Sequence, residues 1–429
     1  MAAAVALGVV AGPVAGAAVL PGPAGAAPVA SAGAPCQASS PVTPAAAAST
    51  TGVTPTSLTV GNISIISGPV PGLFKGAPTG AQAYFAYVNS KGGVNGRKLK
   101  LDSYDDGFNG QANGTETTTA VAKDFGLVGN FSLFDSSGCK ILAQNSAVPD
   151  VSVTLDPGTN SLPNVFSAQP LATGWSLGPL QYYKQHFPGA NKVGSLVSNT
   201  ATAIAQWNGE AAALKHEGFQ VTYVRYVSPL ESDFTTDVVS MRAKGVNALN
   251  LTALDWQVAA IIIQDATQQG WRPKLIFSGG PVYADQFIKT AGGAAATNGI
   301  MIGQVQALYL GQDAKSVPAV KTFLSWVKKV NPSWTPDLFT LFGWASAQLF
   351  VQALQAAGKN PTRGAVLTQL KKITSFTANG LLAAANPAKK LPSNCDLMAT
   401  IKSGKFVRVQ PTGSGFDCSS KFYFAPAGG

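Results

Sequence analysis

Charged side chains are scarce in this sequence. Only 12% of the 429 residues are Asp, Glu, Lys or Arg, whereas 46% are hydrophobic. This balance excludes intrinsic disorder over most of the chain, because disordered chains combine low hydrophobicity with high charge. At this length the hydrophobic residues can bury more than one core, so we expect two domains rather than one.

The sequence also lacks any concentrated run of positive charge. Its formal net charge is +10, yet lysines and arginines are scattered singly, with short pairs such as Arg97-Lys98 and Lys328-Lys329 as the only clusters. A nucleic-acid-binding surface would need a basic stripe with interleaved aromatic residues, which is absent. We therefore expect no nucleic-acid partner, and favour a solvated basic surface on a protein near an anionic cell envelope.

Histidine is rarer still, with two residues in the whole chain. Residues 174–178 read Gly-Trp-Ser-Leu-Gly and match the G-x-S-x-G turn that holds the nucleophile of many hydrolases. That chemistry needs an acidic residue and then a late histidine. Glu210 is the only acidic residue between Ser176 and His216, and a long stretch of chain follows His216. The better interpretation is a helix N-terminus capped by Thr173.

Other catalytic patterns are missing too. Residues 137–140 match the S-x-x-K motif of β-lactamases, but the S-D-N and K-T-G motifs that accompany it do not follow. Two isolated histidines and four cysteines provide no cluster of metal ligands, and no glycine-rich phosphate loop occurs. Asp105 and Asp106 are neighbours at a strand end, so we expect them to accept backbone amides in a turn. The sequence predicts no enzyme, no cofactor and no metal.

The first residues predict export. Residues 1–20 are almost wholly Ala, Val, Gly and Leu, and small-residue A-x-A triplets follow between residues 24 and 34. These features are typical of a secretory signal peptide, which we place at residues 1–34. A membrane span is the alternative, but Pro13, Pro21 and Pro23 weaken it, and no other segment is long and apolar enough. We expect an extracytoplasmic protein of the periplasm or cell envelope, not itself membrane-spanning.

Residues 35–56 are rich in Ala, Ser, Thr and Pro and predict a flexible linker before the folded part. Pro35, directly before Cys36, spoils the sequence needed for lipid attachment, so no lipid anchor is expected.

Four cysteines in an exported chain predict two disulfides, for which three pairings exist. We favour Cys395 with Cys418, because they bracket a strand-like segment at 401–409, and this leaves Cys36 with Cys139. Free buried thiols are the alternative.

After residue 57, short β-branched runs alternate with helical patterns, which predicts βα units around mostly parallel sheets, an α/β fold. Glycines 92, 218 and 270 follow helical patterns where a left-handed C-cap is needed. The expected strands are 58–66, 98–104, 127–131, 150–155, 192–198, 220–227, 248–253, 274–278 and 300–305. The expected helices are 76–89, 113–125, 137–146, 175–186, 203–217, 234–244, 256–269, 283–290, 319–330, 336–357 and 363–373.

A series of motifs stands at the start of this pattern. Ile66-Ser67-Gly68-Pro69 precedes a helix opening with Gly76 and Thr79-Gly80-Ala81; residues 88–99 read VNSKGGVNGRKL, and Tyr104-Asp105-Asp106 follows. In this order and spacing they strongly resemble the branched-chain amino-acid-binding family of type I periplasmic binding proteins, which are ABC transporter substrate-binding proteins. Later segments also fit, so the resemblance covers residues 56 to the C-terminus.

The resemblance implies two doubly wound parallel-sheet lobes, joined by three crossovers, that close on a solute about a hinge. On this chain the crossovers fall near 168–173, 304–306 and 376–380. Lobe 1 is then expected at 57–170 plus 306–376, and lobe 2 at 171–305 plus 381–424.

Ligands of such sheets lie at the carboxyl ends of the strands, in the crevice between lobes. The matching stretches are 71–74, 132–135, 154–156, 202–207, 255–256 and 279–281. The resemblance thus implies twelve candidate ligand-binding residues: Leu73, Phe74, Ser132, Leu133, Phe134, Thr154, Asp156, Thr202, Trp207, Asp255, Trp256 and Gly280.

These positions depart from those of amino-acid binders. Leu133 and Phe134 stand where small hydroxyl residues are expected, and Gly279-Gly280 stands where an acidic side chain would hold the ammonium group. Asp255 or Asp156 could replace that acid. The aromatic and aliphatic candidates instead indicate a pocket that binds by area and shape, so we expect a neutral or largely apolar solute.

Each candidate also has a structural interpretation. Trp207 and Trp256 stand at helix starts and could pack between helix and sheet. Leu133 and Phe134 could belong to the core, and Asp255 could cap the helix that follows it.

The expected function is capture of a small molecule outside the membrane and delivery to an ABC transporter permease. An amino-acid-binding protein with altered ammonium contacts is one alternative. A ligand-sensing ectodomain of the same fold is another, and it would need a transmembrane helix after the second lobe, which the sequence does not contain.

Overall fold

The computed structural model describes residues 36, 40–70, 72–171 and 174–424. The predicted signal peptide at 1–34 and the predicted helix cap Thr173 lie outside these residues. Within the described part of the chain, no helix has both the length and the hydrophobicity needed to cross a bilayer.

The first sheet has five parallel strands in the order β2-β1-β3-β4-β5. Its strands are β1 (Ser57–Ser64), β2 (Lys98–Asp105), β3 (Leu127–Val128), β4 (Asp150–Val151) and β5 (Val165–Phe166). The helices of this lobe are α2 (Gly76–Ser90), α3 (Gly110–Lys123), α4 (Asp135–Gln144), α5 (Pro157–Ser161), α13 (Pro318–Val330), α14 (Leu338–Ala356) and α15 (Arg363–Leu370).

The second sheet has seven strands in the order β13-β12-β11-β10-β9-β7-β8. The parallel strands are β7 (Lys192–Ser198), β8 (Gln220–Val227), β9 (Ala248–Asn250), β10 (Leu275–Ser278) and β11 (Met301–Gln304), and the antiparallel strands are β12 (Leu397–Lys402) and β13 (Lys405–Gln410). The helices are α6 (Leu177–His186), α7 (Ala201–His216), α8 (Thr235–Ala243), α9 (Trp256–Gln268), α10 (Asp285–Thr290) and α11 (Gly293–Thr297), with the 3-10 turn Gly280–Val282. A separate pair joins β6 (Trp175–Ser176) to β14 (Phe422–Tyr423).

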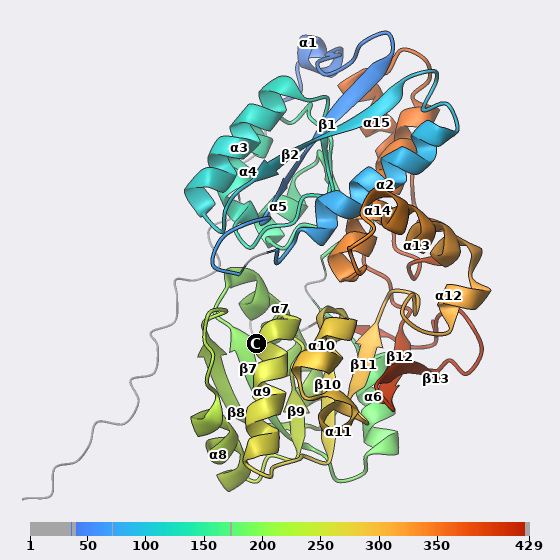
Figure 1. Cartoon of the computed structure of the whole chain (residues 1–429). Helices are drawn as coiled ribbons and strands as arrows, with labels where there is room; N and C mark the ends of the chain where they lie inside the picture. The colour runs from blue at the N-terminus through green and yellow to red at the C-terminus, as the bar shows by residue number, and fades with distance from the viewer. Residues whose placement is uncertain (1–35, 37–39, 71, 172–173, 425–429) are drawn as a thin grey trace, which may run out of the picture.

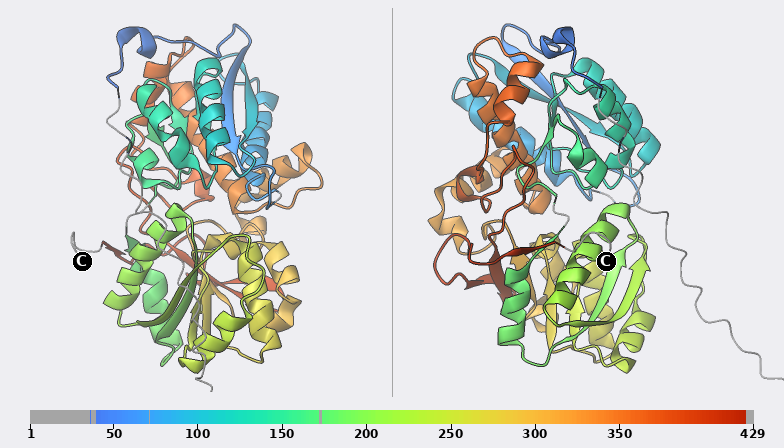
Figure 2. Two further views of the ribbon diagram at one scale, coloured as in Figure 1. Left: turned by 90° about the vertical axis from the view of Figure 1, so that its left-hand side faces the viewer. Right: turned by 180° about the vertical axis from the view of Figure 1, so that it is seen from behind.

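The two sheets lie in two lobes, one above the other in Figure 1, and each lobe is built from distant parts of the chain. The blue and cyan N-terminal part and the orange helices α13 to α15 form the upper lobe. The green and yellow middle part and the dark red strands β12 and β13 form the lower lobe, as the view from behind also shows (Figure 2). The predicted α/β class with two mostly parallel, doubly wound lobes is confirmed.

Most expected elements are present, and the glycine stops explain several boundaries. Gly92, Gly218 and Gly270 have φ values of 104°, 85° and 59°, the left-handed conformation that was predicted for them. The strand-like segment at 401–409 is instead the hairpin of β12 and β13, turning at Ser403-Gly404.

The chain passes between the lobes after β5, after β11 and before β12. Two of these passages differ from the expected boundaries. Helix α12 (Asp313–Ser316), expected in lobe 1, is held to lobe 2 by a buried ion pair of 2.5 Å between Asp313 and Arg408 of β13. Residues near 390, expected in lobe 2, contact lobe 1, because Lys390 Nζ donates to the carbonyl oxygens of Asn160, Leu162 and Val165.

The segment expected to be a flexible linker is docked on lobe 1, which corrects that prediction for residues 40–56. Helix α1 (Pro44–Ala47) packs against α15, and the amide of Ser40 donates to the carbonyl of Ala143. Cys36 pairs with Cys139 of α4, and Cys395 pairs with Cys418, which are the favoured disulfide pairings. A disulfide and backbone hydrogen bonds remove the freedom that the Ala- and Pro-rich composition suggested.

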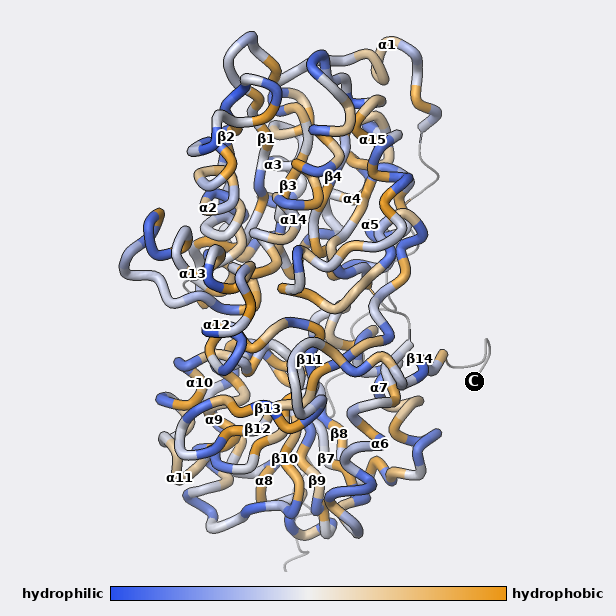
Figure 3. Tube along the Cα trace, turned by 90° about the vertical axis from the view of Figure 1, so that its right-hand side faces the viewer, coloured by the Kyte–Doolittle hydropathy of each residue, from blue (hydrophilic) through white to orange (hydrophobic). Residues whose placement is uncertain are grey.

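Hydrophobic residues follow the strands and inner helices of both lobes, while the outer turns are hydrophilic (Figure 3). In lobe 1, helices α2 and α14 cross at very short range. A Cβ atom at Gly80 would lie 1.9 Å from the carbonyl oxygen of Thr340, and one at Gly343 would lie 1.9 Å from that of Ala77. Only glycine allows this approach, which sets the position of α14 and of its first turn.

Candidate functional site

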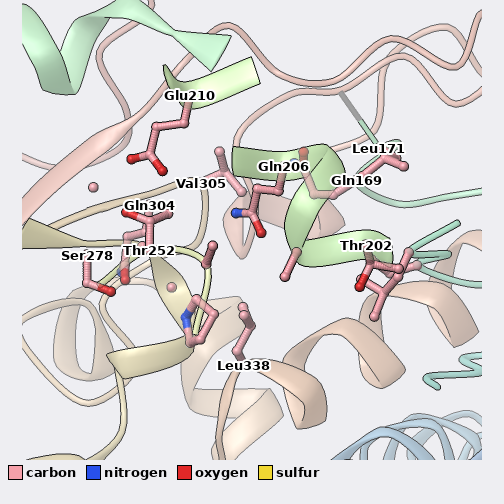
Figure 4. Close-up of a pocket in the computed structure, with 18 of the residues that line it drawn as sticks. Gln169, Leu171, Thr202, Gln206, Glu210, Thr252, Ser278, Gln304, Val305 and Leu338 are labelled. Carbon is pink, nitrogen blue, oxygen red and sulfur yellow. The ribbon is translucent and has the colours of Figure 1, made fainter. Parts of the chain in front are cut away.

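A cavity of about 390 Å³ lies between the lobes. Its walls come from the carboxyl ends of strands in both sheets, from the first turns of α7, α9 and α14, and from the segments that pass between lobes. This is the place where open α/β sheets bind ligands. Figure 4 shows a close-up of these lining side chains.

The lobe 1 wall is apolar and aromatic. It includes Leu73, Phe74, Phe131, Phe339 and Phe342, with Leu133 and Leu338 beside them. The ring of Phe74 lies 4.7 Å from that of Phe131 and 4.6 Å from that of Phe339, in edge-to-face contacts. These rings are almost fully buried in the lobe 1 core, so the wall is a rigid part of that core.

The lobe 2 wall is polar by comparison. The side chain of Thr200 caps α7 by accepting a hydrogen bond from the amide of Ala203, and Thr202 and Gln206 of the same helix line the cavity. Asp255 caps α9 by accepting from the amides of Gln257 and Val258, at 2.9 and 3.1 Å. Both helix N-termini therefore face the cavity, with their positive ends toward a bound molecule.

The cavity also extends into the interior of lobe 2. Pro179, Leu180 and Tyr183 of α6 line it together with Phe277 of β10, and Leu180, Tyr183 and Phe277 are all buried. These side chains belong to the hydrophobic cluster between α6, α7 and the sheet. The cavity is therefore a cleft with a deep extension beneath α7.

Glu210 of α7 stands at this deep extension and is only 1% exposed. Its atom Oε2 has no hydrogen-bond partner among the described residues. Burial raises the pKa of Glu210 to about 7, although hydrogen bonding from the side chains of Asn250 and Thr252 acts to lower it. In Figure 4, Glu210 stands on the same side of the pocket as Thr252, Ser278 and Gln304.

The charges that line the cavity are all acidic. They are Glu210, Asp255 and Asp396, and no Lys, Arg or His belongs to the described lining. Burial raises the pKa of Asp396 to about 6, against hydrogen bonds from Ser176 and Ser420. Burial also raises the pKa of Asp255. A bound anion would find helix N-termini here but no cationic side chain.

Seven of the twelve candidate residues line this cavity: Leu73, Phe74, Leu133, Thr154, Thr202, Asp255 and Gly280. Pro71, in the same predicted stretch as Leu73, lies outside the described residues.

The other five candidates lie elsewhere, and three are used by lobe 1 itself. Ser132 Oγ donates to Asp106 and accepts the amide of Phe134. The ring of Phe134 packs edge-on against Phe108, with 5.3 Å between the centroids. Asp156 caps α5 by accepting the amide of Thr159. The prediction that Ser132, Phe134 and Asp156 line the cavity is therefore wrong.

The two tryptophans follow their structural interpretation. Trp207 is 4% exposed in the cluster beneath α7, and Trp256 is half-buried at the start of α9, packed against the main core. Both belong to helices whose first turns reach the cavity, yet their side chains point into helix-sheet packing. The helix start alone does not tell which way a side chain points.

Several lining residues were missed by the sequence prediction. Phe339 and Phe342 stand three residues apart in the first turn of α14, so their helical spacing was visible but their facing partner was not. Glu210 carried a clearer signal. It lies three residues after Trp207 and four before Leu214, which places a charged residue on the buried face of an apolar helix.

The hydrolase-like motif has a structural use. Ser176 occupies the N-cap position of α6, one residue before the helix, and its Oγ donates to Asp396 Oδ2 at 2.9 Å. The helix thus begins later than predicted. His216 stacks on Tyr423, and no hydrogen bond within the described chain joins Ser176 to a histidine.

The acidic pair before α3 follows the prediction of a turn. Asp105 Oδ1 accepts the amides of Ile66, Ser67 and Gly107, and Asp106 accepts the amide of Phe108. Among described residues, the one group with metal-ligand types is Cys36, Cys139 and Asp156. Both sulfur atoms of that group form a disulfide and cannot act as thiolate ligands.

Comparison with known proteins adds to this geometry. A family profile described as "Periplasmic binding protein" matches residues 57–405. A protein of Brucella suis named Leu/Ile/Val-binding protein homolog 1 is 25% identical over 292 residues, which cover 66% of this chain and 73% of that protein.

Two solved structures share the fold. One is a fatty acid ABC transporter substrate-binding protein from Thermomonospora curvata, with a TM-score of 0.72 and 19% identity over 86% of this chain and 94% of that one. The other is a possible leucine/isoleucine/valine-binding protein from Rhodopirellula baltica, with a TM-score of 0.71 and 17% identity over 84% and 98% of the two chains.

Proposed function

This chain belongs to the periplasmic binding protein family, and from that premise we propose that it captures a small, largely apolar solute between its lobes for an ABC importer. The observation that carries the proposal is the aromatic wall of Phe74, Phe131, Phe339 and Phe342 facing a cavity of about 390 Å³. That volume lies within the range of small-molecule sites, which are mostly apolar with a few polar groups that fix orientation.

The named neighbours agree with this class of ligand. The Thermomonospora protein is named for fatty acids and the Brucella relative for leucine, isoleucine and valine, all of which carry hydrocarbon groups. Burial of hydrocarbon against the lobe 1 wall would supply most of the binding free energy, at about 25 cal/mol per Å² of apolar surface. Closure of the lobes would then remove the ligand from water and present a closed form to the permease.

The second candidate is an amino-acid-binding protein, favoured by the carboxyl groups of Glu210 and Asp255. Either could accept hydrogen bonds from an ammonium group, since Gly280 leaves no acidic side chain at its own position. In both proposals the protein binds one solute without converting it and acts outside the cytoplasm, as members of its family do.

Thermal unfolding of the purified protein in the presence of candidate solutes tests the proposal. Because a ligand at 100 times its dissociation constant adds ~2.7 kcal/mol of stability, a true ligand raises the midpoint clearly. We expect 1-octanol or another eight-carbon compound to raise it more than leucine, isoleucine or valine. A rise with these amino acids alone would refute the apolar-solute proposal in favour of the second candidate.

A further inference from the structure

The deep extension of the cavity ends at Glu210 of α7, whose carboxyl group has an unpaired oxygen. Glu210 Oε2, Asn250 Nδ2 and Ser195 Oγ are buried and make no hydrogen bond within the described protein. Asn250 of β9 and Ser195 of β7 are paired in register on neighbouring strands, and hydrogen bonding from the Asn250 side chain acts to lower the pKa of Glu210. The Glu210 carboxyl group therefore lies near the polar strand residue Asn250, yet its Oε2 atom makes no hydrogen bond of normal geometry within the described protein.

Buried polar atoms are nearly always hydrogen-bonded, because leaving one unpaired costs free energy. A helix position between Trp207 and Leu214 would ordinarily hold an apolar residue. A carboxyl group kept there, lining a ligand cavity and with its Oε2 atom unpaired within the described protein, points to a partner that arrives with the ligand.

Resting on the proposed capture of an apolar solute, we propose that Glu210 binds a hydrogen-bond-donating head group, ammonium or hydroxyl, at the deep end of the cavity. The hydrocarbon part then extends past Leu180 and Tyr183 toward the aromatic wall of lobe 1. The carboxyl oxygen of Glu210 accepts the N–H or O–H of the head, which removes its unpaired state.

The same lining disfavours a carboxylate head at this position. Glu210 and Asp396 are acidic, and the described lining holds no cationic side chain to balance an anion. A carboxylate beside Glu210 would bring two like charges together in a buried place, which is strongly unfavourable. The head-group preference therefore distinguishes this site from one that binds a fatty-acid anion.

Isothermal titration with three compounds of equal chain length tests the proposal: octylamine, 1-octanol and octanoate. At pH 8 we expect octylamine and 1-octanol to bind at least about tenfold more tightly than octanoate, since charge-assisted hydrogen bonds are the stronger kind. Octanoate binding as tightly as octylamine would overturn the head-group proposal while leaving capture of apolar solutes intact. Failure of all three to bind would instead overturn the proposed function.

A matched pair of variants locates the effect. Glu210→Gln removes the charge with little change of shape and should weaken octylamine about tenfold or more, relative to octanoate. Glu217→Gln removes the same charge at the C-terminal end of α7, outside the cavity lining, where Glu217 pairs with Lys184, and should leave all three affinities unchanged. Equal octylamine affinity in Glu210→Gln and the wild type would overturn the proposal.

The wild-type protein gives a second readout if Glu210→Gln does not fold. Octylamine stays protonated between pH 6 and pH 8, as the lysine amine does. Because the pKa of Glu210 is about 7, octylamine should bind roughly tenfold more tightly at pH 8 than at pH 6. Tyr183 on α6 faces Glu210 but has a pKa raised well above its ordinary range, Asp396 has a pKa of about 6, and the raised pKa of Asp255 belongs to the α9 cap. Equal affinity at the two pH values would count against the proposal.

Discussion

The two walls of the cavity are built differently. The lobe 1 wall consists of aromatic and aliphatic side chains that are also the core of that lobe, and its rings contact one another directly. The lobe 2 wall carries hydroxyl, amide and carboxyl groups from two helix starts, several strand ends and the middle of α7. Lobe 1 therefore supplies area, and lobe 2 supplies the groups that orient a ligand.

This division has a physical reason. Apolar side chains of the wall can also form the core of the lobe, because their burial has no desolvation cost. Since the core is closely packed, a change of shape in these side chains lowers stability. Polar groups that face a cavity contribute little to the stability of the fold, and they lower that stability when they are buried without a hydrogen-bond partner. Substitutions in lobe 1 should consequently affect folding first, and substitutions in lobe 2 should affect ligand preference or pH dependence first.

The largest expected effect comes from Phe74→Ala in lobe 1. The ring of Phe74 packs against Phe131 and Phe339, and its loss leaves a cavity in the core. We expect the free energy of unfolding to fall by about 3–5 kcal/mol, measured by denaturant titration. Phe424→Ala, at a side chain that is 53% exposed, is the control and should change stability little. A loss below about 1 kcal/mol for Phe74→Ala would contradict the conclusion that the lobe 1 wall is part of the lobe 1 core.

Glu210→Gln in lobe 2 should do the opposite and stabilise the free protein at high pH. The pKa of Glu210 is about 7 when folded and 4.5 ordinarily, so its contribution to stability is greatest below pH 4.5 and is lost as pH rises through 7. The variant lacks this loss. Its free energy of unfolding should therefore exceed that of the wild type by up to about 3 kcal/mol at pH 8, and should equal it near pH 4.

Thermal unfolding at both pH values measures this difference, and taking variant against wild type removes the contributions of other buried carboxyl groups. Glu116→Gln is the control, because Glu116 of α3 is partly exposed and forms no ion pair within the described chain, so its loss should change stability little. A Glu210→Gln protein that is less stable than the wild type at pH 8 would show that Glu210 supports the fold rather than a ligand.

A charge on the lobe 1 wall should abolish its apolar character without unfolding the lobe. Leu133 lines the cavity and is only half-buried, so Leu133→Asp can hydrate its carboxylate in the open form. In the closed complex that carboxylate would lie against hydrocarbon, and we expect 1-octanol to bind roughly 30-fold more weakly, or about 2 kcal/mol. Val239→Asp, at an exposed position of α8, is the control for an added charge. Unchanged octanol affinity in Leu133→Asp would place the hydrocarbon elsewhere.

The smallest effect on binding is expected from Trp256→Ala. Trp256 packs against the core at the start of α9 and does not line the cavity, although its neighbour Asp255 does. The affinity for 1-octanol should change by less than about twofold, while the midpoint of thermal unfolding falls. A large loss of affinity with an unchanged midpoint would mean that Trp256 reaches the ligand in the closed form.

Local patterns predicted most of the fold. Alternating strand and helix signals, with glycine stops after α2, α7 and α9, placed the helices of eight or more residues and the longer parallel strands within a few residues. The two-residue strands β5, β6 and β14 were not predicted, since two residues carry no periodic signal. The docking of residues 40–56 was missed for a related reason, because composition describes flexibility of an isolated segment and not its contacts with α4 and α15.

The site was predicted in part. The family resemblance implied which strand and helix ends would meet, and Leu73, Phe74, Leu133 and Thr202 among its candidates line the cavity. It could not identify residues of α14, since the close crossing with α2 at Gly80 and Gly343, which sets the position of that helix, is a tertiary contact. It also could not separate Asp255, which faces the cavity, from its neighbour Trp256, which faces the core.

The sequence by itself determined the α/β class, the two lobes, the cysteine pairs worth testing and the expectation of an apolar ligand. The α/β class follows from periodicity and the cysteine pairs from their spacing, while the lobes and the apolar ligand are what the resemblance, carried by short ordered motifs, implies. Only the tertiary structure decided that α14 completes the aromatic wall and that Glu210 ends the cavity beneath α7. Those facts depend on which surfaces meet across more than a hundred residues of chain, and no local preference encodes that distance.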